Sequence, residues 1–150
     1  MPATSAFPSS SAPDKLNRFL AFLVDNVIAA VLASVPIAGG ILSAGYLVAR
    51  DGLRLEFMNQ RSVGKHLLGL QVERADGRAM DLETSVQRNW MWGLGPVTAA
   101  AATVPLFGGL LAVTVALFAL GVGLYEAYRV FERADGRRWG DELAQTQVVG

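Results

Sequence analysis

The stretch from Arg18 to Pro36, RFLAFLVDNVIAAVLASVP, constrains the fold more than any other part of the sequence. Its interior carries one ionisable side chain, Asp25. A helix of 19 residues rises about 28 Å, which is close to the hydrocarbon thickness of a bilayer. A helix that is apolar on all sides belongs in a membrane or in a large core, and a chain of 150 residues cannot build such a core. The stretch therefore predicts a transmembrane helix with an acid inside it.

Asp25 lies on a face of this helix that otherwise carries small residues. Ala21, Asp25, Ala29 and Ala33 recur at a spacing of four, so they share one face. Small side chains allow a second helix to approach closely, and the acid is expected to face protein. Arg18 precedes Asp25 by seven residues, about 10 Å along the helix. That is too far for an ion pair, so Asp25 is expected to have its partner elsewhere.

Composition supports a small membrane protein and excludes several chemistries. The chain is 52% hydrophobic and 17% charged, with a mean hydropathy of +0.35. Basic and acidic residues balance at 13 each, which predicts no nucleic-acid partner. The absence of cysteine excludes disulfides and thiol catalysis. With one histidine and no nucleophile–base pair or carboxylate dyad, we expect no enzyme activity, no metal and no cofactor. Residues 1–17, rich in Pro, Ser and Ala, read as a disordered tail without a signal peptide.

Two further apolar blocks follow. Ile37 to Ala49 is only thirteen residues long, short for a crossing. Either its helix continues to Arg54, with Arg50 and Arg54 reaching the interface, or the segment is re-entrant. Gly93 to Tyr125 has no charge over thirty-three residues, enough for a hairpin. The predicted fold is an all-α membrane protein with two transmembrane helical hairpins, four crossings in total.

The two hairpins look like copies of each other. Residues 36–40 and 105–109 are both Pro-x-x-Gly-Gly, and residues 61–72 match 137–148 at their Arg, Gly, Leu, Gln and Val positions. This predicts a parallel internal repeat with halves at about 18–72 and 88–149, within one membrane domain over 18–149. The alternative is that Gly and Pro coincide at hairpin tips by chance. Each half ends in a short strand, the first at 70–73, where apolar and polar residues alternate.

The positions of Lys and Arg predict the topology. All thirteen lie in the N-terminal region, in the 50–93 loop or from Arg129 onward, and the two tips have none. The positive-inside rule then places both termini, the long loop and the strands in the cytoplasm of a multi-pass protein.

Several charged residues are candidates for a functional site. Asp25 either exchanges a proton and a monovalent cation or is a structural acid. Arg18 either pairs with Asp141, pairs with Asp25 of a neighbouring protomer, or is an interfacial anchor. Arg88 takes the place of Arg18 in the second half. Lys65 aligns with Asp141 across the repeat, so these two either pair or are solvated separately.

The sequence resembles the RDD family of small bacterial membrane proteins over about residues 15–149. The resemblance rests on the Arg and Asp of the first helix, Ser-x-Gly-Lys-x-Leu-Leu-Gly-Leu-x-Val at 62–72, Arg-Asn at 88–89, and Gly-Asp-x-Leu-Ala-x-Thr-x-Val-Val at 140–149. The family is named for one arginine and two aspartates, which by position fall on Arg18, Asp25 and Asp141, with Asp51 as the other candidate for the second aspartate. Gln145 stands where many members have Gly.

The resemblance implies a protein of the bacterial inner membrane with a role in transport, since some members are described as sodium/proton antiporters. We therefore expect a transport or transport-associated protein that exchanges a cation and a proton through Asp25. A protein with four helices has little interior for a pathway, so a homo-oligomer or a larger complex is expected. The alternative is a non-catalytic assembly or regulatory subunit of a membrane complex.

Overall fold

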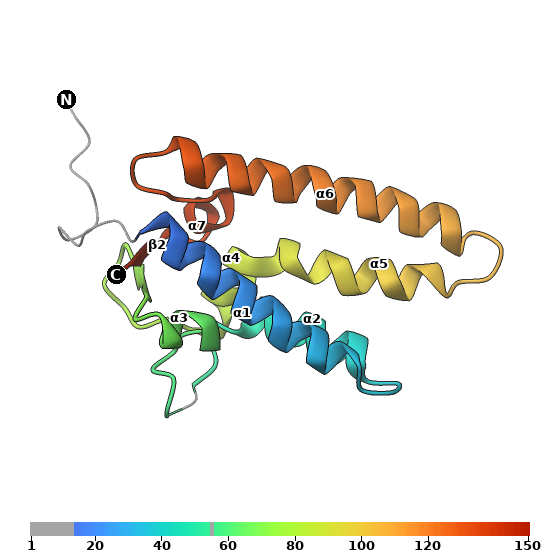
Figure 1. Cartoon of the computed structure of the whole chain (residues 1–150), viewed down its shortest axis with the longest axis horizontal. Coiled ribbons are helices and arrows are strands. Elements are labelled where there is room, and N and C mark those ends of the chain that lie inside the picture. The colour runs from blue at the N-terminus through green and yellow to red at the C-terminus, as the bar shows by residue number, and fades with distance from the viewer. Residues whose placement is uncertain (1–13, 55) are drawn as a thin grey trace.

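The computed structural model describes residues 14–54 and 56–150, and it consists mainly of two helical hairpins that lie side by side (Figure 1). The first joins α1 (Lys15–Ala33) to α2 (Gly39–Ala49), and the second joins α5 (Leu94–Ala102) to α6 (Gly108–Glu132). The Asp14 side chain caps α1 by accepting a hydrogen bond from the backbone of Leu16. The last three residues of the predicted 1–17 tail are therefore helical, and residues 1–13 lie outside the described part.

The buried face of α1 largely follows the predicted ladder. Ala21, Asp25 and Ala29 are buried, and α2 packs against this helix. Ala33 is exposed, because the chain leaves α1 there and turns toward α2. The opposite face is apolar and open, with Val27 58% exposed, as expected for a helix surrounded by lipid.

The two arms of each hairpin differ in length. Within the described residues, α1 and α6 are the helices long and apolar enough to cross a membrane. The 11 residues of α2 rise about 16 Å. The 9 residues of α5 rise about 14 Å, and α5 is preceded by the 3-10 helix η1 (Trp90–Gly93). The predicted continuation of the second helix to Arg54 is wrong. α2 ends at Ala49, and Arg50 turns inward because it pairs with Asp25.

The two hairpin tips lie at the same end of the molecule and share one conformation (Figure 1). Ile37 and Leu106, each following the tip proline, have φ of 66°. The first glycine of each motif donates its N–H to the residue before the proline, Gly39 to Val35 and Gly108 to Val104, at 2.9 Å in both tips. A Cβ on Gly39 would lie 2.2 Å from the carbonyl oxygen of Ala33, which explains the glycine.

The polar segments gather at the other end, where the chain also finishes (Figure 1). They form α3 (Val63–Leu67), β1 (Gln71–Arg74), α4 (Leu82–Asn89), α7 (Trp139–Leu143) and β2 (Thr146–Val149). β1 pairs antiparallel with β2, with Val72 opposite Val148, and Leu70 and Val148 pack on Ala21. The strand predicted at 70–73 is thus found one residue later.

The short helices α3 and α7 occupy the segments that the predicted repeat aligns. Each is five residues long, and each has a glycine, Gly64 or Gly140, pressed against another helix. A Cβ on Gly64 would lie 2.0 Å from the carbonyl oxygen of Ala21, and one on Gly140 would lie 2.2 Å from that of Arg88. These contacts bring the N-terminal turns of both helices against the backbone and carboxylates of the longer helices.

Candidate functional site

A cluster of charged side chains lies buried where the hairpins meet the polar end. We call it the charged cluster: four carboxylates and five cations of the described chain, namely Asp25, Asp51, Glu126, Asp141, Arg18, Arg50, Lys65, Arg88 and Arg138. Each of these side chains is at most 11% exposed. Buried charges of this kind persist only when they are paired and hydrogen-bonded.

Asp25 is held by three groups. Its Oδ2 lies 3.1 Å from Nη1 of Arg50. Its Oδ1 accepts hydrogen bonds from the Tyr46 hydroxyl at 2.8 Å and from the backbone N–H of Gly64 at 2.9 Å. The partner of Asp25 therefore comes from the end of α2, not from Arg18.

Asp51 is also surrounded by donors. Its Oδ1 lies 2.5 Å from Nζ of Lys65, and its Oδ2 lies 3.4 Å from Nη1 of Arg88 and accepts from Nδ2 of Asn89 at 3.0 Å. Burial acts to raise the pKa of Asp51, but the charges of Lys65, Arg88 and Arg50 hold that pKa well below its ordinary value. Neither predicted alternative for Lys65 and Asp141 holds, because Lys65 pairs with Asp51 and both Lys65 and Asp141 are buried instead of solvated.

Asp141, on α7, pairs with arginines from much earlier segments of the chain. Its Oδ2 lies 2.6 Å from Nη2 of Arg18 and accepts the backbone N–H of Arg138 at 3.0 Å. Its Oδ1 lies 2.7 Å from Nε of Arg88 and 3.3 Å from Nη2 of Arg138. Burial opposes ionisation, but the arginines, Arg88 first, hold the pKa of Asp141 well below its usual range. Arg88 thus bridges Asp51 and Asp141.

Glu126 and Arg138 belong to the cluster, although sequence reasoning did not select them. Oε1 of Glu126 accepts the backbone N–H of Gly140 at 3.0 Å, and Oε2 lies 3.7 Å from Nε of Arg138. Gly64 makes the same contact with Asp25, so Glu126 on α6 accepts in the second half the hydrogen bond that Asp25 accepts in the first. The signal was available, because Glu126 is the first charge after an uncharged run.

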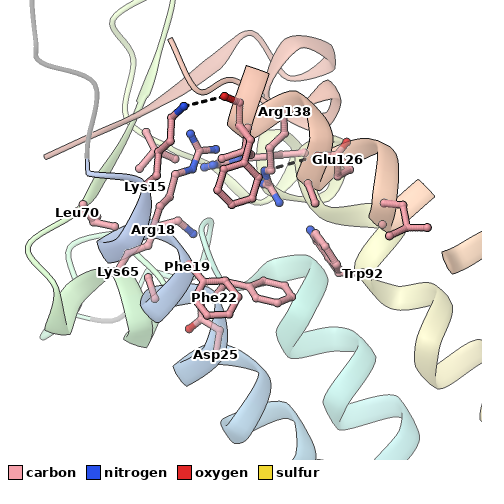
Figure 2. Close-up of a pocket in the computed structure, with 18 of the residues that line it drawn as sticks. Lys15, Arg18, Phe19, Phe22, Asp25, Lys65, Leu70, Trp92, Glu126 and Arg138 are labelled. Atoms are coloured by element: carbon pink, nitrogen blue, oxygen red, sulfur yellow. Dashed lines mark hydrogen bonds and ion pairs between the residues drawn. The ribbon is translucent and has the colours of Figure 1, made fainter. Parts of the chain in front are cut away.

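A cavity of about 460 Å³ lies between α1 and α6 and reaches the charged cluster (Figure 2). Phe19, Phe22 and Asp25 approach it from α1, and Trp92 lies opposite, with its indole nitrogen turned toward Arg138 (Figure 2). The Arg138 guanidinium lies 5.8 Å from the Trp92 ring centroid. Within the described residues, no group of three or more His, Cys, Asp and Glu side chains is placed to hold a metal ion.

Comparison with known proteins places the chain in a family. The model of the RDD family matches residues 41–145, more than half of the sequence. No curated protein and no solved structure matches the chain. Asp51, Arg88 and Asp141 lie inside the matched range. Arg18 and Asp25 precede it, so the assignment of these two residues as the family's arginine and first aspartate stays a prediction. This chain, with its mostly helical architecture and exposed apolar helices, belongs to the RDD family and is a membrane protein.

Proposed function

We propose that this protein is a non-catalytic assembly or regulatory subunit of a complex in the bacterial cytoplasmic membrane, built as a homo-oligomer or with other membrane proteins. The observation that carries the proposal is that three of the four buried carboxylates, Asp25, Asp51 and Asp141, are each held by several cationic or hydrogen-bonding groups. Asp25 has two hydrogen-bond donors and an ion pair with Arg50, and Asp51 and Asp141 are each enclosed by several donors or cations. A cation exchanger has to free one carboxylate in each cycle, and arginine does not release its proton in the physiological range.

The cluster instead suits a structural task. Its members come from α1, the end of α2, α3, α4, α6 and the start of α7, so the ion pairs fix six segments relative to one another. Such a network carries specificity of arrangement more than stability, because burying the charges costs much of what the ion pairs return. The result is a rigid polar end from which the long helices α1 and α6 present apolar faces to lipid or to other membrane helices.

We further propose that both hairpins enter the membrane from the cytoplasm, with both termini on that side. Two observations support this topology. The tips lie at one end of the molecule (Figure 1), and every Lys and Arg lies away from them in sequence. In this arrangement α2 and α5 are the short arms of the two hairpins, and each reaches from the tip toward the charged cluster. The segment after α2 completes the second crossing, and η1, which precedes α5, completes the third. With α1 and α6 this makes four crossings.

The internal repeat belongs to the same proposal. It is supported by the identical φ of 66° after each tip proline, by the matching α3 and α7, and by the glycine-to-carboxylate contacts of both halves. The strands add to this, because Val72 and Val148, which the alignment equates, face each other at the centre of the antiparallel pair.

The second candidate function, cation/proton exchange, rests on the position of Asp25. Seven residues lie between it and the end of α1 at Ala33, a rise of about 12 Å, which supports a position inside the membrane. It also lines the cavity between α1 and α6.

Proteoliposomes separate the two functions. The purified full chain is reconstituted, and cation-driven proton flux is measured for the wild type, for Asp25→Asn and for Asp76→Asn, an exposed control on the loop after β1. The assembly proposal expects no flux in any of the three. Flux in the wild type and in Asp76→Asn that vanishes in a folded Asp25→Asn would overturn it and establish exchange through Asp25.

The assembly proposal also predicts what gentle extraction yields. The protein should leave the membrane with further copies or with another membrane polypeptide at a fixed ratio, measured by native mass spectrometry. A wild type that is monomeric and without a partner at every detergent concentration would contradict the proposal.

A further inference from the structure

The cavity between α1 and α6 has walls of two opposite kinds. Its outer part is formed by apolar side chains that face the lipid, such as Phe19, which is 54% exposed, and Leu124, which is 63% exposed. Its inner part is formed by the charged cluster. A volume of about 460 Å³ lies in the range of sites that hold small molecules. The shape is therefore that of a site for a molecule with one polar end and one apolar end.

The inner part contains buried donors that have no acceptor. Among residues 14–54 and 56–150, Nε of Arg50 and Nε1 of Trp92 are buried without a hydrogen bond. Nη1 of Arg88 and Nε of Arg138 make no hydrogen bond either, and approach carboxylates only at 3.4 and 3.7 Å. Native proteins rarely leave such groups unpaired, since each costs the free energy of its desolvation.

The charge of the cavity is strongly positive. Among the described residues, its lining includes two carboxylates, Asp25 and Glu126, and six cations: Lys15, Arg18, Arg50, Lys65, Arg88 and Arg138. Adding Asp51 and Asp141, which lie behind this lining, still leaves two positive charges without a carboxylate. The Glu126 carboxylate repels an anion, but its Oε2 lies 3.7 Å from Nε of Arg138, whose charge offsets this repulsion.

We propose that this cavity binds an anionic phospholipid from the cytoplasmic leaflet. The phosphate group accepts hydrogen bonds from Arg50, Arg138 and Trp92, and one acyl chain lies in the groove between α1 and α6. Phosphate oxygens satisfy several N–H donors at once, and arginine suits them well. A second membrane helix would fill the apolar part but bring no backbone acceptors, because its carbonyl groups are already used within the helix.

Two variants test the two parts of the site. Gly123 lines the cavity, and a Cβ at this position would have no heavy atom within 4 Å, so Gly123→Leu is expected to obstruct the groove and to keep the fold. Gly121 is also in open space on α6 and does not line this cavity, so Gly121→Leu is the matched control. Trp92→Phe removes the indole N–H and keeps the aromatic contact with Phe22, whose ring centroid lies 5.0 Å away.

The full chain is reconstituted in nanodiscs of phosphatidylcholine with a minor fraction of phosphatidylglycerol, and the lipids retained on release are counted by native mass spectrometry. We expect one phosphatidylglycerol molecule on the wild type and on Gly121→Leu, and none or few on Gly123→Leu. Trp92→Phe should weaken retention about tenfold, the equivalent of about 1.4 kcal/mol for one hydrogen bond to a charged group. Inorganic phosphate should not displace the lipid, because it cannot use the groove.

Three results would overturn the proposal. The first is retention of both lipids in the ratio of the bilayer. The second is equal loss of phosphatidylglycerol in Gly121→Leu and Gly123→Leu, with no effect of Trp92→Phe. The third is a wild-type dimer that Gly123→Leu dissociates, which would assign the groove to a second copy of the chain. None of these results depends on the flux measurement, so this proposal and the assembly role fail separately.

Discussion

Replacing Arg88 by methionine should be among the most destabilising single changes in this protein. Arg88 is 1% exposed and is the residue that contacts both Asp51 and Asp141. Methionine keeps a long unbranched side chain of similar reach and removes the charge. Removing one partner of a buried ion pair typically costs about 3–5 kcal/mol of unfolding free energy, and here two carboxylates lose a partner together.

The remaining contacts set an upper limit to this loss. Asp51 keeps Lys65 at 2.5 Å, and Asp141 keeps Arg18 at 2.6 Å. The charged cluster changes from one net positive charge to none, so no bare negative charge is created. We therefore expect Arg88→Met to cost about 3 kcal/mol, the lower end of that range. Arg138→Met, whose side-chain ion pairs are longer at 3.3 and 3.7 Å, should cost about 1–2 kcal/mol.

Unfolding by sodium dodecyl sulfate in mixed micelles measures these differences. Arg78→Met is the control, since Arg78 is exposed and approaches Asp76 only at 3.8 Å, and it should change stability by less than about 0.5 kcal/mol. Asp51→Asn in the Arg88→Met background should cost about 1–3 kcal/mol less than its own effect in the wild type. Equal stability of Arg88→Met and Arg78→Met, or strict additivity of the double variant, would refute this reasoning.

Three further predictions follow from individual residues. Gly64→Ala should prevent stable folding or lower the melting temperature strongly, because its Cβ would lie 2.0 Å from the carbonyl oxygen of Ala21; Gly121→Ala, placed in open space, should not. Asp51 and Asp141 have a folded pKa below the unfolded value, so their contribution to the stability of the fold is complete above the unfolded pKa of about 4 and is lost as the pH falls further. The melting temperature, measured from neutral to acidic pH, should therefore be level and then drop. A melting temperature that rises below a pH of about 4 would contradict this. Gln145→Gly should raise stability by about 0.5–1 kcal/mol, because Gln145 is exposed and has a φ of 49°, and an unchanged or lower stability in chemical unfolding would show that this conformation is not strained.

The sequence was most informative about features that depend on a single helix, such as which of its faces is buried. The apolar length of α1 and the alanine ladder predicted which face of that helix is buried, because helical periodicity alone fixes that face. The pairing of Arg18 with Asp141 was one of the alternatives stated, because both lie at the same end of the predicted topology. The strand at 70–73 was recognisable from its alternation, and its shift by one residue lies within the usual uncertainty of element ends.

The sequence was least informative where a charge is paired across segments. Arg50 was expected at the interface, because an arginine at a helix end usually reaches water, yet a carboxylate on the neighbouring helix draws it inside. Lys65 was matched with Asp141 by alignment, but Asp51 is closer in space after the turn at the end of α2. Glu126 was missed because the alignment compared the first helices of the two halves, whereas the equivalent carboxylate contact is made by the second helix, α6.

The ion pairs of Asp141 have a consequence for the order in which the chain is made. Asp141 follows Arg18 by 123 residues and Arg88 by 53 residues. At roughly 5–20 residues per second, synthesis reaches Asp141 about 6–25 s after Arg18. During that time Arg18 lacks the carboxylate with which it pairs in the folded protein. The ion pairs of Asp141 therefore cannot form until α7 has been made, so the closing of this part of the charged cluster is a late step in the folding of the chain.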